Sequence, residues 1–343
     1  MGTEYYGKFL RKVKTLNMSL IPTVGQNRVF VLGSGFSASM GLPTLADLFK
    51  NLMDFPEREG EEDKLNIFTA LDFLYPHFDY RITPPSYPPF EEFLALVTAA
   101  EDFPFFLTGT WECWRRSAIR LLTDFLAEKS KCAETNDLLH DFVSHIEKGD
   151  VVITYNWDTL IERALLSQHK NINFLKRDPD SIAILKLHGS LSWVEIPEGT
   201  SLKHPESVKS LQDRVVYTPD YTYYNVWDTL NLPPLIVPPG LSRRSIVNQL
   251  FKNVWGEAFQ SLANCDSLTF IGYSIPKDDI QARSLLSIGW YSRSQNRSKD
   301  RIKYNLIDPN PEVLGRYASC ISNELIYIQS YFDDNVLNIL FNG

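Results

Sequence analysis

Cysteine is scarce in this chain of 343 residues, and the four that occur are far apart. Cys113, Cys132, Cys265 and Cys320 form no C-x-x-C pair, and no histidine lies near them at the spacing of zinc ligands. We therefore predict no structural zinc and no other bound metal. The chain also starts without a secretory signal pattern, so we expect reduced thiols in a cytoplasmic protein.

Excess positive charge and long apolar runs are also missing. The formal net charge is −8, whereas a surface that binds DNA or RNA normally carries clustered excess Lys and Arg. The longest apolar runs fall well short of the roughly 18 residues that a membrane helix needs. We predict no direct nucleic-acid binding and no membrane association. The short basic segment from Lys8 to Lys14 is more simply a solvated surface.

Short apolar runs alternate with amphipathic segments along most of the chain. The runs at 28–32, 151–155, 182–187, 267–271, 302–307 and 325–328 are typical of strands buried on both faces of a parallel sheet. Helical periodicity occurs between them, at 158–166, 245–262, 278–291 and 311–319. This alternation predicts an α/β fold with a Rossmann-like, mostly parallel sheet flanked by helices.

The segment between the first two predicted strands is much longer than a crossover requires. A parallel crossover needs about a dozen residues, but this segment shows helical periodicity at 65–74, 90–100, 111–128 and 136–147. We therefore predict an inserted helical module over residues 55–147. Residues 1–54 and 148–343 would then form one Rossmann-type NAD-binding domain.

A glycine-rich turn, Gly33-Ser34-Gly35-Phe36-Ser37, follows the first predicted strand and precedes a predicted helix at 45–53. Glycine allows close approach of the backbone to a pyrophosphate, and a helix N-terminus attracts the anion. A lone Gly-x-Gly is as often a simple tight turn. The dehydrogenase fingerprint requires a further glycine where this chain has Ala38, so a dehydrogenase is disfavoured.

Two polar residues follow later strands. Asn156 comes after the second predicted strand, and His188, with Gly189 behind it, comes after the third. The carboxyl ends of parallel strands are where ligands bind, and an imidazole with a pKa of about 6.5 can accept a proton near neutral pH. Asp158 can cap the next helix. A turn and a cap explain Asp158 well but explain Asn156 less well.

Together these motifs resemble those of sirtuins. The glycine turn and its continuation, Gly41-Leu42-Pro43-Thr44, resemble GAGxSxxxGIP, and Thr154 to Asp158 with His188-Gly189 resemble QNID and HG. Gly272-Tyr273-Ser274-Ile275 resembles GTSL. The closest match is to the SIR2-like NAD hydrolases of bacterial antiphage defence.

The resemblance implies a role for each matched residue. Asn156 and His188 would be catalytic, with Asp158 on the nicotinamide carboxamide and Asp308 on the adenosine ribose. The residues implied to bind NAD+ are Gly33, Ser34, Gly35, Ser37, Thr44, Asp158, Gly272, Ser274 and Asp308. An Asp at 308 would also repel the 2′-phosphate of NADP.

Sirtuin deacylases carry a Cys₄ zinc ribbon after their His-Gly motif. This chain lacks the ribbon, which disfavours peptide deacylation. Residues 190–232 contain no cysteine and carry six aromatic residues, whose simplest role is packing: Trp193, Tyr217, Tyr221, Tyr223, Tyr224 and Trp227.

We therefore predict an NAD+ glycohydrolase that releases nicotinamide and ADP-ribose or its cyclic form. By resemblance it would be an antiphage effector gated by homo-oligomerisation or by a separate sensor protein. Two alternatives stay open. One is an NAD-dependent deacylase or ADP-ribosyltransferase, and the other is a non-catalytic module that binds NAD or ADP-ribose.

Overall fold

The computed structural model describes residues 27–56, 62–76, 86–100, 109–133, 135–199, 208–212, 214–218, 232–239, 249–277, 279–296, 303–321 and 325–342. The basic segment near the start and the aromatic residues Tyr221 to Trp227 lie outside these ranges.

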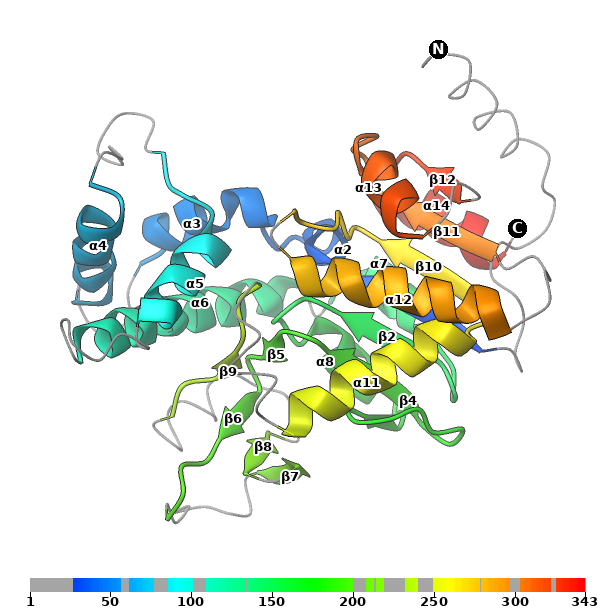
Figure 1. Cartoon of the computed structure of the whole chain (residues 1–343), viewed down its shortest axis with the longest axis horizontal. Helices are drawn as coiled ribbons and strands as arrows, with labels where there is room; N and C mark the ends of the chain where they lie inside the picture. Colours follow the sequence, from blue (N-terminus) through cyan, green and yellow to red (C-terminus); the bar gives the residue numbers. More distant parts are fainter. Residues whose placement is uncertain are drawn as a thin grey trace.

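A seven-stranded sheet occupies the centre of the molecule (Figure 1). Its strands are β1 (Arg28–Leu32), β2 (Val151–Thr154), β3 (Ile172–Asn173), β4 (Ile182–Lys186), β10 (Ser267–Ile271), β11 (Lys303–Ile307) and β12 (Ile326–Ile328). Their spatial order is β12-β11-β10-β1-β2-β4-β3, and every neighbouring pair is parallel. The predicted fold class is confirmed. Only the two-residue β3 was not expected.

Helices cover both faces of the sheet, which is why β1, β2, β4 and β10 are buried along their whole length. Side chains alternate between the faces. Phe30 of β1 meets Phe142 of α7 (Asp137–Ser144) and Phe341 of α14 (Asp334–Phe341) on one face. Phe270, the register partner of Val31, meets Tyr317 of α13 (Val313–Cys320) on the other.

Two long helices, α11 (Gln249–Asn264) and α12 (Ile280–Asn296), pack side by side on that second face (Figure 1). Helix α8 (Leu160–Ser167) follows β2 and packs against α7. Helix α14 was not predicted from the sequence; its first turn is capped by the Asp333 carboxylate, which accepts the amide of Val336.

The glycine turn is itself the start of a helix. The sequence predicted a first helix at 45–53, but α2 (Ser34–Ser39) begins directly after Gly33 and precedes α3 (Leu45–Asp54). The chain changes direction between them at Gly41, whose φ is +92°. A helix of six residues is too short to show an apolar period, so sequence pattern could not reveal it.

Helices α3 to α6 lie together beside the sheet (Figure 1). After α3 come α4 (Glu62–Leu74), α5 (Phe90–Ala100) and α6 (Thr110–Ala133), and α6 packs against each of the other three. Phe49 of α3 contacts the rings of Phe90 and Phe93 on α5. We call α3 to α6 the helical layer. The domain limits predicted from the sequence stay a prediction.

Short antiparallel strands follow β4. One pair is β5 (Gly189–Ser190) with β9 (Leu235–Ile236), and a second sheet consists of β6 (Trp193–Glu195), β8 (Val215–Tyr217) and β7 (Lys209–Gln212). Phe174 contacts the rings of Trp193 and Tyr217. The predicted packing role is confirmed for these two aromatic residues.

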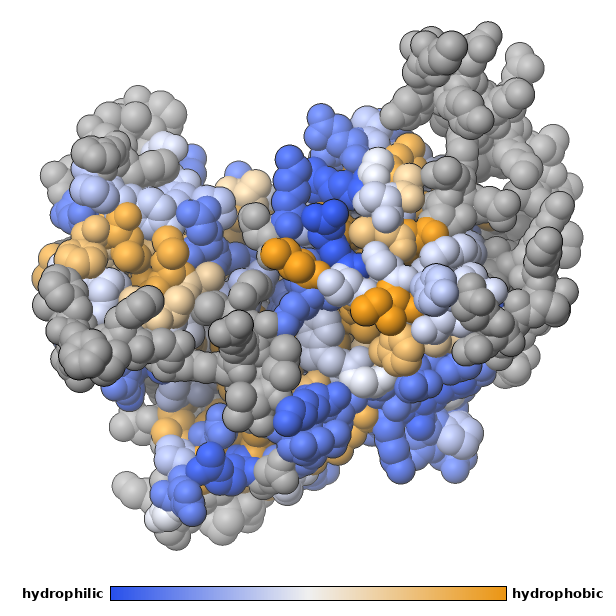
Figure 2. Space-filling model, viewed as in Figure 1, coloured by the Kyte–Doolittle hydropathy of each residue, from blue (hydrophilic) through white to orange (hydrophobic). Residues whose placement is uncertain are grey.

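Hydrophobic residues on the face drawn in Figure 2 gather over α4 and along α12. Leu65 and Phe73 of α4 and Ile280 and Ile288 of α12 are exposed. Single exposed apolar side chains are common on protein surfaces. Across the described ranges, no helix combines the length and apolar character required to cross a membrane.

Candidate functional site

The strand order reverses between β1 and β10. From β1 the chain continues to β2 and β4 on one side, and later returns to β10 and β11 on the other. In open parallel sheets, ligands bind in the crevice at such a reversal, outside the carboxyl ends of the strands. Gly33 follows β1, Gly272 follows β10, Asn156 lies just beyond β2 and His188 just beyond β4.

The turns after β1 and β10 touch one another through glycine. The amide of Gly33 donates to the carbonyl of Ile271 (3.1 Å), and the amide of Gly35 donates to that of Gly272 (2.9 Å). Gly272 has a φ of +59°, and a Cβ added there would lie 2.4 Å from the carbonyl carbon of Gly35. These glycines are therefore explained first by the contact between the two turns. The amides of Gly33 and Gly35 already have acceptors, so they are not available to a phosphate.

A pocket opens beside this contact. The empty space within it, including open solvent at the mouth, is about 670 Å³. Seven of the predicted site residues line it: Ser34, Ser37, Asn156, Asp158, His188, Gly272 and Ser274. Gly33, Gly35, Thr44 and Asp308 are not part of its lining.

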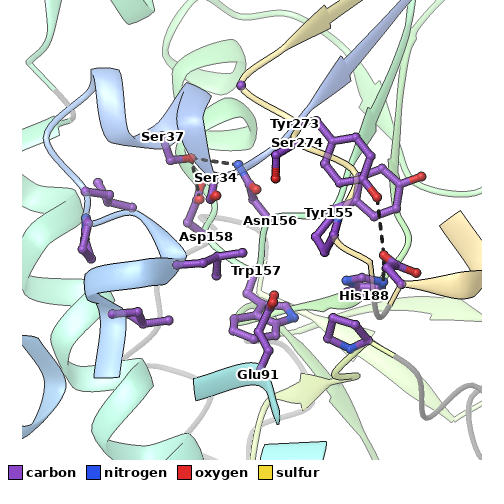
Figure 3. A pocket seen from close by; sticks show the side chains of 18 of the residues that line it. Ser34, Ser37, Glu91, Tyr155, Asn156, Trp157, Asp158, His188, Tyr273 and Ser274 are labelled. Atoms are coloured by element: carbon purple, nitrogen blue, oxygen red, sulfur yellow. Dashed lines mark hydrogen bonds and ion pairs between the residues drawn. The ribbon is translucent and has the colours of Figure 1, made fainter. Parts of the chain in front are cut away.

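One side of the pocket is a hydrogen-bonded group of Ser37, Asn156 and Asp158, here called the Asn156 cluster (Figure 3). Asn156 Nδ2 donates to the Gly33 carbonyl and to Ser37 Oγ, both at 2.9 Å. Ser37 Oγ donates to Asp158 Oδ2 (2.7 Å), and Asp158 Oδ1 accepts the amide of Leu160 (3.1 Å) at the start of α8. As predicted, the Asp158 carboxylate accepts a backbone amide at the start of α8, although Thr159 occupies the N-cap position. Because both amide hydrogens of Asn156 are engaged, its Oδ1 is the atom left to accept a hydrogen bond.

A buried ion pair lies beneath the Asn156 cluster. Lys186 Nζ, at the end of β4, is 2.8 Å from Glu162 Oε1 on α8, and both side chains are 1% exposed. The same ammonium donates to the backbone carbonyl of Asp158. Burial raises the pKa of the Glu162 carboxyl, and the charge of Lys186 opposes that rise. The ion pair connects β4 with α8, and the bond from Lys186 to the Asp158 carbonyl connects both to the loop that contains Asn156.

The other side of the pocket contains Tyr155, His188, Tyr273 and Asp279, here called the His188 cluster (Figure 3). His188 Nε2 lies 3.3 Å from Asp279 Oδ2, and the Tyr273 hydroxyl donates to the same oxygen at 3.4 Å. The rings of Tyr155 and Tyr273 stack with centroids 4.0 Å apart. Burial raises the pKa of both phenols well above the usual value, so both are neutral near pH 7.

His188 has one unused nitrogen. Its Nδ1 is buried, and it has no hydrogen-bond partner among the described residues. A buried polar atom without a partner costs free energy. The His188 side chain lines the pocket, and a ligand group that donates a hydrogen bond to Nδ1 would satisfy this atom.

Several lining residues were missed by the sequence analysis. Glu91 of α5 and Leu126 of α6 reach the pocket from the helical layer, and Trp157 lies between the two clusters (Figure 3). An acidic residue in the first turn of a helix resembles an ordinary cap in sequence, so only the packing of α5 against the pocket identifies Glu91. Asp279 lies at the start of the helix predicted over 278–291, and it does cap α12, but it also faces His188.

Of the four predicted residues outside the pocket lining, Asp308 and Thr44 use their side chains in local hydrogen bonds. Asp308 follows β11, one strand beyond β10, and its Oδ1 accepts the amide of Asn310 at 2.8 Å. Burial raises the pKa of the Asp308 carboxyl. The Thr44 hydroxyl donates to Asp47 Oδ2 (3.0 Å) at the start of α3.

Much of the pocket lining lies in the segments that follow β2, β4 and β10. Residues 150–298 match the family of SIR2-like domains. The resemblance stated from the motifs is thus confirmed over this range. Asn156, His188 and Asp279 all lie within the SIR2-like region, whereas β1 and the glycine turn precede it in sequence but lie between β2 and β10 in the sheet.

Similar solved structures are described as sirtuins. "Structural Basis for the Mechanism and Regulation of Sir2 Enzymes" is 16% identical, with 99% of this chain and 97% of that chain covered and a TM-score of 0.45. "The Structural basis of Sirtuin Substrate Affinity" is 15% identical, with 99% and 98% covered and a TM-score of 0.41. "Structure of Sir2Tm bound to a propionylated peptide" is 15% identical, with 97% and 94% covered and a TM-score of 0.40. No curated protein matches the chain.

The described residues contain no group of three or more His, Cys, Asp or Glu side chains arranged to hold a metal ion. The three described free cysteines are Cys113, Cys265 and Cys320.

Proposed function

We propose that this SIR2-like region hydrolyses the bond between nicotinamide and ribose in NAD+. A SIR2-like domain supports an enzyme that uses NAD. The observation that carries the finer proposal is that Asn156 and His188, from the ends of two different strands, line one pocket at the strand-order reversal. His188 has a buried nitrogen without a partner among the described residues, and Asn156 retains an acceptor oxygen.

The charge of the pocket suits one half of NAD+ better than the other. Three acidic residues line it, Glu91, Asp158 and Asp279, and the described lining contains no Lys or Arg. Nicotinamide riboside is cationic, and cleavage of a glycosidic bond passes through an oxocarbenium-like ribose. Preorganised negative charge stabilises a positive charge that develops in the transition state. We therefore place the nicotinamide ribose in this pocket.

The reaction can be written with the residues in named roles. Asn156 Oδ1 accepts a hydrogen bond from the attacking water. The water oxygen bonds to the anomeric carbon, the C–N bond breaks, and its electron pair goes to the nicotinamide nitrogen, which loses its positive charge. His188 accepts a proton from a ribose hydroxyl as the oxocarbenium forms and returns it afterwards. The proton lost by the water leaves to solvent.

The remaining proposed contacts follow from the geometry of the lining. Ser34, just after β1, and Ser274, just after β10, line the pocket, and we propose that the diphosphate continues from the ribose past their hydroxyls. Asp158 is proposed to hold the nicotinamide carboxamide with lone pairs that remain beside its bonds to Ser37 and Leu160. Gly33, Gly35, Thr44 and Asp308 are not part of the lining and are proposed only for the adenosine half.

The biological part of the proposal rests on the resemblance rather than on the geometry. We propose that the activity belongs to a cytoplasmic antiphage effector that depletes NAD+, and that a second copy of the chain or a separate sensor protein holds it inactive until a signal arrives.

The test is incubation of the purified full chain with NAD+, chromatography of the products, and calorimetric titration with NAD+. Nicotinamide and ADP-ribose, or its cyclic form, formed without any peptide would support hydrolysis. Release of nicotinamide only in the presence of an acylated peptide would instead indicate a deacylase. Binding of NAD+ without turnover in every condition would indicate a sensor module. A chain that neither binds NAD+ nor releases nicotinamide would overturn the proposal.

A matched pair of variants ties the result to the pocket. Asn156→Ala should retain binding and lose turnover, because the residue acts on the water. Asn173→Ala, a change at β3 away from the pocket lining, should leave turnover unchanged.

A further inference from the structure

We propose that Asp279 is a positioning residue that holds His188 in the Nε2–H tautomer, so that Nδ1 is the basic atom that meets the substrate. This inference rests on the proposed function only for the identity of that substrate. The pairing of Asp279 with His188 stands on its own geometry.

The arrangement of the two side chains selects one nitrogen. Asp279 Oδ2 lies 3.3 Å from His188 Nε2, and the side chains are 2% and 5% exposed. An ionised carboxylate is an acceptor only, so the nitrogen that faces it must carry the proton. A neutral imidazole has one N–H and one lone pair, which leaves the lone pair on Nδ1.

The other nitrogen is the one that lacks a partner. His188 Nδ1 is buried and unpartnered within the described residues, and the imidazole lines the pocket. A sugar hydroxyl donating to Nδ1 would satisfy it. When the hydroxyl proton moves to Nδ1, the ring becomes an imidazolium with both nitrogens protonated, and the carboxylate of Asp279 stabilises its charge.

The rest of the surroundings fixes the place of the ring but not its tautomer. The amide of Val237 donates to the carbonyl of His188 (2.9 Å), and Trp255 Nε1 donates to that of Leu187 (3.2 Å). The ring of Tyr155 meets the imidazole edge to face at 5.3 Å between centroids. Of the contacts described for the imidazole, Asp279 supplies the one ionisable acceptor.

The two oxygens of Asp279 have separate tasks, which makes the inference testable. Oδ1 accepts the amide of Ala282 at 3.0 Å and caps α12, while Oδ2 faces His188 and the Tyr273 hydroxyl. Asn and Ser are also good N-caps. Replacing Asp279 by either residue therefore preserves the cap but removes the carboxylate oxygen that faces Nε2.

Asp279→Asn is the decisive variant. Its amide group donates where Oδ2 accepted, which favours the Nδ1–H tautomer and blocks the base. In serine hydrolase triads, the same exchange lowers kcat by about 10⁴-fold. Here we expect kcat for NAD+ to fall by about 10²-fold or more, with KM changed by less than about threefold, because the residue acts through His188 rather than on bound substrate.

Nuclear magnetic resonance of the protein with ¹⁵N-labelled histidine reports the tautomer without requiring activity. The His188 signal is identified by its loss in His188→Gln. Wild type should show Nε2–H, and Asp279→Asn should show Nδ1–H.

Two controls separate positioning from capping. Asp279→Ser should lower kcat as much as Asp279→Asn does, although α12 stays capped. Asp279→Glu, which restores a carboxylate, should recover part of the lost kcat. Asp333→Ser changes the cap of α14, which accepts the amide of Val336 at 2.9 Å, and should leave kcat and the tautomer unchanged.

The possible results separate the two proposals. A wild-type His188 with its proton on Nδ1, or a wild-type rate in Asp279→Asn or Asp279→Ser, would overturn the role of Asp279. If the chain neither binds nor cleaves NAD+, the proposed function fails. The tautomer of His188, measured by NMR in wild type and in Asp279→Asn, still decides whether Asp279 controls His188.

Discussion

The Asn156 cluster and the His188 cluster face the same pocket but use their hydrogen-bonding groups differently. In the Asn156 cluster, Asn156 donates both amide hydrogens, to Gly33 and Ser37, and each carboxylate oxygen of Asp158 accepts a hydrogen bond. In the His188 cluster, the carboxylate of Asp279 is engaged, but Nδ1 of His188 has no partner among the described residues.

The difference indicates two kinds of contribution to one site. A hydrogen-bonded network of this kind holds its members in a single arrangement, and it leaves the acceptor oxygen of Asn156 and the remaining lone pairs of Asp158 for a ligand. A histidine nitrogen kept without a partner is costly to the fold and available to a substrate. We therefore expect changes in the Asn156 cluster to affect both stability and activity, and changes at His188 to affect mainly activity.

The largest expected effect is on turnover. His188→Gln should lower kcat for NAD+ by about 10²- to 10⁴-fold, because it removes a general base. The midpoint of thermal unfolding should change little, since the lost ring had one nitrogen unpartnered. Chromatographic rates and scanning calorimetry measure the two quantities. A large loss of stability without loss of rate would reverse the comparison between the clusters.

Next in size is the ion pair beneath the Asn156 cluster. Lys186→Met should destabilise the protein by about 3 to 5 kcal/mol, because it leaves Glu162 buried without its partner and frees the carbonyl of Asp158. Urea unfolding gives the free energy. Arg214→Met, in a pair with Glu195 whose side chains are 52% and 42% exposed, is the matched control and should cost about 0.5 kcal/mol or less.

The glycine contact that both clusters adjoin should be nearly as sensitive. Gly272→Ala combines a positive φ with a Cβ 2.4 Å from a backbone atom of Gly35, and should cost about 3 kcal/mol. Gly256→Ala in α11 meets nothing within 4 Å and should stabilise by about 0.5 to 1 kcal/mol. Equal effects of the two changes in urea unfolding would show that the turns after β1 and β10 do not touch in solution.

A smaller effect is expected within the Asn156 cluster. Asn156→Asp keeps the shape but loses both N–H donors to Gly33 and Ser37 and adds a negative charge near Asp158. We expect a loss of about 1 to 3 kcal/mol in stability together with loss of turnover. Asn171→Asp, away from the pocket lining, is the control. Unchanged stability would mean that these hydrogen bonds do not form in solution.

The smallest effect concerns pH. Because burial raises the pKa of Asp308 above its unfolded value, the folded state binds this proton more tightly. The contribution of the protonated Asp308 carboxyl to folding stability is therefore full below the unfolded pKa and is lost as pH rises through the folded pKa. The stability of Asp308→Asn relative to wild type should therefore be higher at pH 7 than at pH 3.5, as measured by thermal unfolding at both pH values. The opposite trend would contradict the direction of the shift.

Much of the architecture was predictable because it depends on local pattern. Apolar runs such as Val151 to Thr154 fit only a strand covered on both faces, and such strands followed by helices form a parallel sheet. The short α2 and β3 were not predictable, since six and two residues carry no period. Helix α14 was also missed, although Asp333 and the apolar residues behind it are a usable signal.

The sequence by itself determined the sheet, its flanking helices and the polar residues at the strand ends, because alternation, glycine and strand-end position are local properties. Only the tertiary structure decided which of those residues meet. It brought Asn156 and His188 to one pocket, left Asp308 and Thr44 off its lining, and turned Asp279 from a helix cap into the partner of His188. The physical reason is that distance between side chains depends on strand order and helix packing, which no short stretch of sequence encodes.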